Sequence, residues 1–457
     1  MTSQKVIDYL SSNQDKHLDD LVEFLKIPSI SAIASHHDDI EKAALFLESE
    51  LSSLNLKTEI IRTEGNPLVY AETEQLENRK TLLFYGHYDV QPTDPLELWN
   101  SEPFNPLIKD GIIYARGSSD DKGQLYSHLK AVEAYVKTGT PIPVNIKMIF
   151  EGEEECGGHT IYEYTENNPD KLKCDAVIVS DTSLYNEDTP AICYSLKGLA
   201  FMEIRVKGPS QDLHSGSYGG TVQNPGNAIC EIVANLKDTN SRVLIPGFYD
   251  DVIELEEDER ASFKSLNYTE DTLRADTGSP GPFGEKGYTT LERMWARPTC
   301  DVNGIFSGYT GEGAKTIIPS TATAKVSMRL VPNQDPDKIA SSFISYVKSI
   351  CPPGLDIEVE NLHNAQSVMV PRNGAMMKAG ANAMEAGFGK YPVFIREGGS
   401  IPIVGTFQSS LKAPVLLLGY GLPNDNIHSP NEKYHLDNYY KGILTTAHLL
   451  SFASTVE

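Results

Sequence analysis

The stretch Thr81–Asp89 reads TLLFYGHYD, an apolar run followed by a histidine and, two residues later, an aspartate. Two further apolar runs, Val144–Phe150 and Ala176–Val179, are followed within two residues by the acidic residues Glu151 and Asp181. Short apolar runs of this kind are typical of strands that are buried on both faces. Apolar residues at helical spacing lie between them, as in Gln124–Val136. Strands that alternate with helices predict an α/β domain with a doubly wound, mostly parallel sheet.

The pattern changes after about Tyr194. The expected elements there are a strand, a helix, one or two strands, a helix and a strand, at Leu199–Val206, Pro225–Leu236, Thr316–Leu330, Asp335–Ile350 and Leu355–Val359. This order resembles a split β-α-β, ferredoxin-like sandwich. A further apolar strand, Val415–Leu418, suggests that the first domain then resumes. We therefore predict a first domain made of residues 1–195 and 367–457, interrupted by an inserted α+β domain of residues 196–366.

Composition limits the possible partners. The chain of 457 residues has 39 Lys and Arg against 63 Asp and Glu, a net charge of −24. This charge repels nucleic-acid phosphates and anionic membranes, so neither is expected as a partner. No apolar stretch approaches the ~20 residues of a membrane span, and the start, MTSQKVIDYL, lacks the pattern of a signal peptide. Six scattered cysteines indicate reduced thiols, so we expect a cytoplasmic protein.

Histidines and carboxylates follow the predicted strands. The five segments contain His87, Asp120, Glu151–Glu155, Asp181 and His428. Ligand crevices in open α/β sheets lie beyond the carboxyl ends of the strands, so these side chains are expected at one edge. A lone histidine or acidic cluster is usually structural, but this explanation would have to hold at all five segments and would leave four carboxylates repelling one another in EGEEE.

The types of side chain indicate which cofactor to expect. Histidine and carboxylate without thiolate suit Zn²⁺, Mn²⁺ or Co²⁺. Two histidines and three carboxylates exceed the needs of one tetrahedral ion and fit two ions that share a bridging carboxylate. We therefore expect two divalent metal ions per chain.

At this point the chain resembles a known family, the dinuclear metallopeptidases that include carnosinases, glutamate carboxypeptidases, aminoacylases and amino-acid desuccinylases. The likeness is closest to the carnosinase-like, cytosolic non-specific dipeptidases and covers nearly the whole chain. The segments that carry it are GHYDVQP, WNSEPFNPLIKDGIIYARGSSDDKGQ, EGEEECGG, DLHSGSYGG, TIIPSTATAKVSMRLVP, EGGSIPI and NDNIHSPNEK. Their order and spacing together are highly specific.

The resemblance implies a role for each residue of the metal site. His87, Asp120 and Asp181 match the ligands of one ion, and Asp120, Glu155 and His428 those of the other, with Asp120 bridging. Glu154 matches the catalytic general acid and base. Asp89 lies two residues after His87, a spacing that lets its carboxylate accept the second N–H of the imidazole of His87 and so support catalysis. The family also has a cis peptide bond after the bridging aspartate.

The inserted domain would then serve as a lid and dimerisation domain. His214 matches a histidine that stabilises the oxyanion from the partner subunit of a homodimer. Arg329 matches the guanidinium that pairs with the substrate's free carboxylate, and Thr316 and Ser400 match positions that hydrogen-bond substrate.

The function that the resemblance implies is hydrolysis of dipeptides. A deacylase acting on N-acyl amino acids has the same chemistry, and only the shape of the pocket distinguishes it. A catalytically silent binding protein would lack part of the ligand set or the base, and all of these residues are present. A serine hydrolase would need the G-x-S-x-G elbow, which GGS at 398–400 does not form. Some members of the family are monomers with an enlarged inserted domain, so whether this chain forms a dimer depends on the branch of the family to which it belongs.

Overall fold

The computed structural model describes residues 2–456, which form two compact units. The first comprises the residues up to Tyr194, Val370–Ile395 and the residues from Ile403 onward. The second comprises Ser195–Met369 and the short loop Arg396–Pro402. The sequence analysis assigned residues 367–457, and with them the loop Arg396–Pro402, to the first domain, whereas the structure groups this loop with the second unit.

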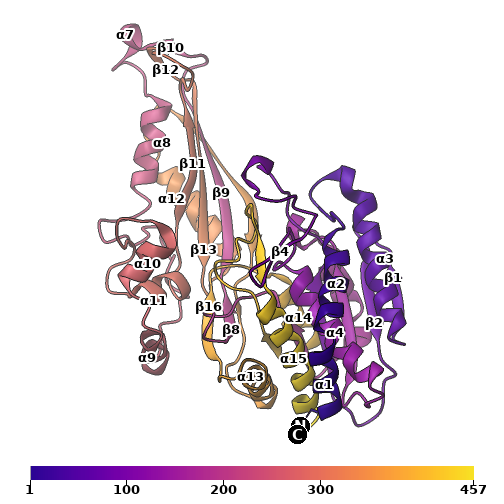
Figure 1. The fold of residues 1–457 in the computed structure, drawn as a ribbon. Helices are drawn as coiled ribbons and strands as arrows, with labels where there is room; N and C mark the ends of the chain where they lie inside the picture. Colours follow the sequence, from indigo (N-terminus) through magenta and orange to yellow (C-terminus); the bar gives the residue numbers. More distant parts are fainter. Residues whose placement is uncertain (1, 457) are drawn as a thin grey trace. The chain divides into compact units, whose positions relative to one another are not determined.

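The first unit is built on a large, mostly parallel sheet (Figure 1). Its strands run in the order β1-β2-β6-β3-β7-β17-β8. The strands β6, β3, β7 and β17 are parallel to one another, whereas β2 and β8 are antiparallel to β6 and β17. Their bounds are β1 Lys57–Ile61, β2 Leu68–Glu72, β3 Thr81–His87, β6 Asn145–Glu151, β7 Ala176–Val179, β8 Ala191–Leu196 and β17 Val415–Leu417. Beside it lies a small sheet of β4 (Leu107–Lys109), β5 (Ile112–Tyr114) and β18 (Lys433–His435).

Helices cover both faces of the large sheet. Phe84 and Tyr85 are neighbours on β3, so their side chains point to opposite faces. The ring of Phe84 contacts His128 on α4 (Lys122–Lys137), and that of Tyr85 contacts Phe407 on α14 (Ile403–Leu411). Further helices of the unit are α3 His37–Ser53, α5 Thr160–Asn167, α6 Pro169–Leu172, α13 Ala375–Phe388 and α15 Leu436–Ala453. The predicted doubly wound α/β fold is confirmed.

The N-terminal helical pattern is broken once. Apolar residues from Val6 to Leu25 read as one helix, but the structure has two, α1 (Gln4–Ser12) and α2 (Gln14–Leu25). Asn13 lies between them with φ −120° and ψ 20°, outside the helical region. Its side-chain amide donates to the carbonyl of Tyr9, a local bond that competes with the helix. None of the helices within residues 2–456 is long and apolar enough to cross a membrane.

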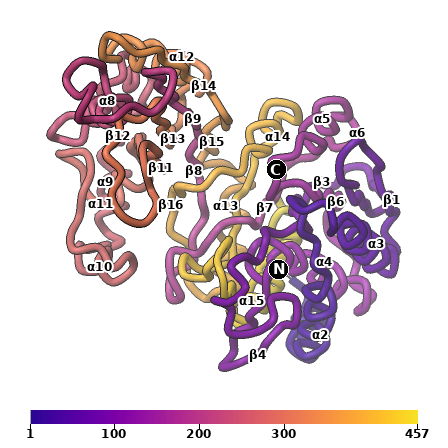
Figure 2. Tube along the Cα trace, turned by 90° about the horizontal axis from the view of Figure 1, so that it is seen from above, coloured from indigo at the N-terminus to yellow at the C-terminus, as the bar shows by residue number. Residues whose placement is uncertain are grey.

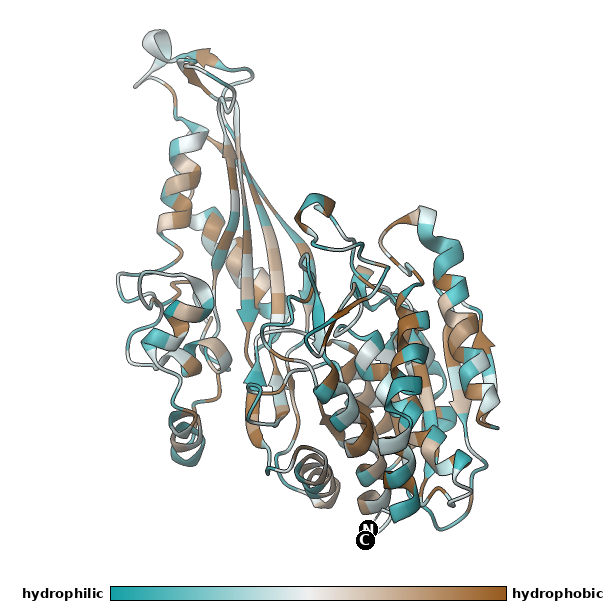
Figure 3. Cartoon of the chain, in the orientation of Figure 1, coloured by the Kyte–Doolittle hydropathy of each residue, from teal (hydrophilic) through white to brown (hydrophobic). Residues whose placement is uncertain are grey.

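The second unit is an open-faced sandwich. Its four-stranded sheet has the order β11-β13-β9-β14, with bounds Asp301–Ser307, Thr321–Leu330, Gly198–Lys207 and Asp356–Ala365. Apolar and polar residues alternate along β9 and β13, and the apolar set packs under α8 (Pro225–Ala234) and α12 (Pro336–Ile350) (Figures 2 and 3). The strand β11 lies at the edge of the sheet and has no clear alternation, so the sequence did not indicate it.

The segment between α8 and β11 adds three helices to the second unit. They are α9 (Glu257–Ser265), α10 (Glu270–Thr277) and α11 (Thr290–Trp295). A separate two-stranded antiparallel sheet pairs β10 (Leu213–His214) with β12 (Ile317–Ile318), and β10 is followed by the single turn α7 (Ser215–Tyr218).

Candidate metal centre and substrate-binding residues

Four neighbouring parallel strands deliver polar side chains to one edge of the large sheet. The strand β3 ends at His87, and β6 ends at Glu151, just before the short helix η3 (Glu154–Cys156). The loops that follow β7 and β17 carry Asp181 and His428. The predicted meeting of these segments is therefore observed, because carboxyl ends of parallel strands share one edge.

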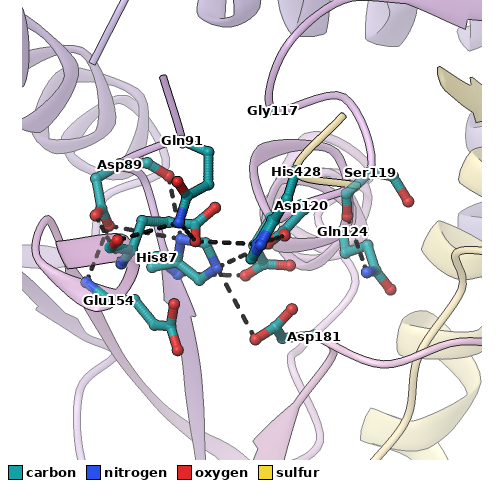
Figure 4. A network of polar contacts seen from close by, with 12 residues as sticks. His87, Asp89, Gln91, Gly117, Ser119, Asp120, Gln124, Glu154, Asp181 and His428 are labelled. Atoms are coloured by element: carbon teal, nitrogen blue, oxygen red, sulfur yellow. Dashed lines mark hydrogen bonds and ion pairs between the residues drawn. The ribbon is translucent and has the colours of Figure 1, made fainter. Parts of the chain in front are cut away.

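Asp120 lies at the centre of these side chains, in the loop before α4 (Figure 4). Its two carboxylate oxygens lie 3.1 Å from Nε2 of His87 and 3.0 Å from Nε2 of His428. Nε2 of His87 is also 3.9 Å from Asp181, and Nε2 of His428 is 3.1 Å from Glu155. The five residues form two triplets that share Asp120.

The geometry of both triplets fits divalent cations. Two ligands about 2.1 Å from one tetrahedral ion lie about 3.4 Å apart, close to the spacings found here. Nε2 of His87 is buried and makes no hydrogen bond within residues 2–456, although Asp120 is near. A buried imidazole nitrogen without such a partner, directed at two carboxylates, is the arrangement expected of a metal ligand.

The electrostatics of the cluster favour bound positive charge. Burial, together with the charge of Asp120, raises the pKa of Asp181 well above its usual value. Burial and the neighbouring carboxylates likewise raise the pKa of Glu154 to about 7. Hydrogen bonds to Asp120 and Glu155 raise the pKa of His428 to about 11. Carboxylates that repel one another in a buried site are stabilised in their ionised form by a cation.

Asp89 orients two parts of the site at once. Nδ1 of His87 lies 3.1 Å from the backbone carbonyl of Asp89 and 3.5 Å from its carboxylate. The same carboxylate accepts the backbone N–H groups of Glu154, at 3.3 Å, and Glu155, at 3.0 Å. Gln91, which the sequence analysis did not single out, donates to Glu155 Oε2 at 2.8 Å. Asp89 thus holds the turn that carries both Glu154 and Glu155, but only Glu155 belongs to one of the two triplets.

A further buried carboxylate of the site, Glu432, could not be recognised from the sequence. It accepts the backbone N–H groups of Gly117, Ser119 and Asp120 at 2.9–3.1 Å and pairs with Arg116 at 2.7 Å. Glu432 lies in the quoted segment NDNIHSPNEK, but nothing in a polar loop indicates that one of its acids is fully buried. It holds the backbone that presents Asp120. The peptide bond after Asp120 is cis, as the resemblance implies.

The remaining predicted residues lie in the second unit as two pairs. His214 on β10 pairs with Ile317, and the next residue, Ser215, donates its backbone N–H to the carbonyl of Thr316 at 3.1 Å. Arg329 on β13 donates from Nη1 to the hydroxyl of Ser400 at 3.2 Å. The structure thus brings His214 beside Thr316 and Arg329 beside Ser400.

Comparisons with known proteins agree with this site. The family model described as Peptidase family M20/M25/M40 matches residues 83–451. The chain is 33% identical over 459 residues to the Cys-Gly metallodipeptidase dug1 of Schizosaccharomyces pombe, with 97% of this chain and 96% of that protein covered.

Solved structures give the same result. Human carnosine dipeptidase 1 is 27% identical with a TM-score of 0.86, and the match covers 100% of both chains. The M20 family metallo-carboxypeptidase Sso-CP2 of Sulfolobus solfataricus is 37% identical with a TM-score of 0.84, covering 96% of this chain and 99% of that one. The predicted family is confirmed, and the cofactors are divalent metal ions. The chain belongs to the peptidase family M20/M25/M40, in the carnosinase-like branch of metal-dependent dipeptidases.

Proposed function

We propose that this enzyme hydrolyses dipeptides with a free C-terminal carboxylate and uses two ions of Zn²⁺ or Mn²⁺, with Co²⁺ as a substitute, in each chain. The observation that supports this most is the placement of Asp120 within 3.1 Å of His87 and 3.0 Å of His428. His87, Asp120 and Asp181 would hold one ion, and Asp120, Glu155 and His428 the other. When bound, these ions polarise a carbonyl oxygen and lower the pKa of water.

Glu154 is the general base in this proposal. Its place beside Glu155 but outside both triplets leaves its carboxylate free of a ligand's role. It takes a proton from the attacking water as the water oxygen bonds to the carbonyl carbon, and it delivers that proton to the amine nitrogen as the C–N bond breaks. Asp89 supports this step, because its carboxylate holds the backbone of Glu154.

Arg329 would bind the substrate's C-terminal carboxylate, with Ser400 and Thr316 as further hydrogen-bonding groups. A guanidinium matches a carboxylate with two parallel N–H groups, which suits this task better than an ammonium. The carboxypeptidase named among the solved structures acts on the same end of a chain, in agreement with this assignment.

His214 would stabilise the oxyanion, acting on the partner's site in a homodimer. Its Nδ1 accepts the backbone N–H of Gly216 at 3.0 Å, which places the ring proton on Nε2. Nε2 is then the hydrogen-bond donor that a developing oxyanion needs. None of the six cysteines forms a disulfide bond within the described residues, which supports the proposal of a reducing, cytoplasmic location.

The proposal is tested with metal-stripped enzyme that is re-supplied with Zn²⁺, Mn²⁺ or Co²⁺. The substrates are Cys-Gly and β-Ala-His, the C-terminal amides of both, and an N-acetyl amino acid. We expect the metals to restore cleavage of the free dipeptides, and the amides to be poor substrates. Faster cleavage of the N-acetyl amino acid than of any dipeptide would favour the deacylase alternative and contradict the proposal.

A further inference from the structure

The loop Arg396–Pro402 of the second unit carries Ser400, the partner of Arg329. Two glycines, Gly398 and Gly399, directly precede Ser400, and a Cβ atom built on either would meet no other atom within 4 Å. Neighbouring side chains therefore leave space around both glycines, whose backbone can adopt many angles. The position of the Ser400 hydroxyl then depends on hydrogen bonds of the loop's backbone and on the residues that flank the glycines.

Two contacts anchor the loop on the N-terminal side of Ser400. The carbonyl of Gly399 accepts the backbone N–H of Lys197 at 3.1 Å. The guanidinium of Arg396 makes a two-point contact with Glu259, with Nε at 2.8 Å from Oε1 and Nη2 on the same oxygen. The side chains of Arg396 and Glu259 are only 3% and 5% exposed. The Arg396–Glu259 pair is thus a buried, charge-assisted anchor four residues before Ser400.

Glu259 comes from a part of the second unit to which the proposed function gives no role. It lies on α9, in the segment between α8 and β11, and α9 packs on α11 through the rings of Phe263 and Trp295, whose centroids are 5.0 Å apart. The same segment also reaches Arg329, because the backbone N–H of Thr299 donates to the carbonyl of Arg329 at 2.9 Å. The segment between α8 and β11 therefore contacts both the strand β13, which carries Arg329, and the loop that carries Ser400.

We propose that Glu259 is a positioning residue for substrate selection, which holds Arg396 and through it sets Ser400 against Arg329. The inference rests on the proposed binding of the substrate carboxylate by Arg329 and Ser400. Without the charge of Glu259, Arg396 loses this two-point contact and the loop before Ser400 is held less firmly. The Gly398–Gly399 backbone then lets Ser400 shift relative to Arg329. The carboxylate site then loses its preorganised geometry, which weakens binding of free dipeptides more than it slows the chemical step.

The test compares Glu259→Gln with Glu285→Gln, a matched control. Glu285 forms a second buried pair in the same segment, with Arg297 at 2.8 Å, and this pair is 9% and 4% exposed. For each variant and the wild type, kcat and KM are measured on a free dipeptide and on its C-terminal amide, together with the melting temperature. We expect Glu259→Gln to raise KM for the free dipeptide about 10-fold, to change kcat much less and to narrow the preference for free over amidated substrate. Glu285→Gln should lower the melting temperature by about as much as Glu259→Gln does, but should leave the preference for free over amidated substrate unchanged.

Three results separate the inference from the proposed function. A folded Glu259→Gln enzyme with wild-type preference, or an equal loss of preference in Glu285→Gln, overturns the positioning role. Equal cleavage of free and amidated dipeptides by the wild type overturns carboxylate recognition itself, whatever the variants do. If Glu259→Gln does not fold, Arg396→Lys keeps the positive charge but loses the two-point contact, and the same shift in KM is expected.

Discussion

Replacement of Glu154 by glutamine isolates proton transfer from metal binding. Glutamine has the shape of glutamate and can still donate and accept hydrogen bonds, but it cannot take up a proton at neutral pH. The backbone N–H of residue 154 still donates to Asp89, so the turn that carries Glu155 is kept. Burial holds the pKa of Glu154 at about 7 before the charge of any bound ion is added, which suits a group that both takes and gives a proton.

The size of the expected loss follows from this role. Loss of a general base costs about 10²–10⁴-fold in rate, which corresponds to roughly 3–5 kcal/mol in the activation barrier. We therefore expect kcat of Glu154→Gln to fall by about this factor, while KM changes little and two metal ions per chain remain. Glu155→Gln is the matched control, because it alters the next residue of the same turn and should lose metal.

The assay is steady-state hydrolysis of a free dipeptide beside elemental analysis of the gel-filtered protein. Near-normal activity of Glu154→Gln would refute its role as the base. Loss of metal from this variant would show instead that Glu154 is a ligand.

Two further predictions concern the second unit. Arg329→Ala should raise KM for free dipeptides by about 30- to 1000-fold, because a charge-assisted pair in a partly buried site contributes about 2–4 kcal/mol to binding. Kinetics on free and amidated dipeptides test this, and an unchanged KM for the free dipeptide would contradict it. His214→Ala and Glu154→Gln, each inactive alone, should complement each other after co-refolding: half of randomly mixed dimers are hybrids with one intact site of two, so activity should reach about one quarter of wild type. Hybrids that form but stay inactive would show that His214 acts within its own chain.

The parts of the site that follow strands could be predicted from the sequence. His87 and Asp181 come directly after apolar runs, and the parallel arrangement of those runs requires both residues at one edge. The sharing of Asp120 between two triplets depended on the family resemblance, because no periodicity relates a loop aspartate to a histidine 308 positions later (His428).

Other features could not be predicted because they depend on tertiary contacts. Glu432 looks like an ordinary acid of a polar loop, and only the fold places it under three backbone N–H groups. The edge strand β11 lacks alternation, since most of its residues are exposed and no face of it is clearly buried. The break at Asn13 depends on one local hydrogen bond within an otherwise continuous helical pattern.

We propose that one carboxylate, Asp120, serves two metal ions. Counting the metal ions per chain in the wild type, Asp120→Ala and His428→Ala after identical dialysis tests it most directly. We expect two ions in the wild type, about one in His428→Ala and none in Asp120→Ala, because only Asp120 belongs to both triplets. An Asp120→Ala protein that keeps one ion, as His428→Ala does, would contradict the shared carboxylate.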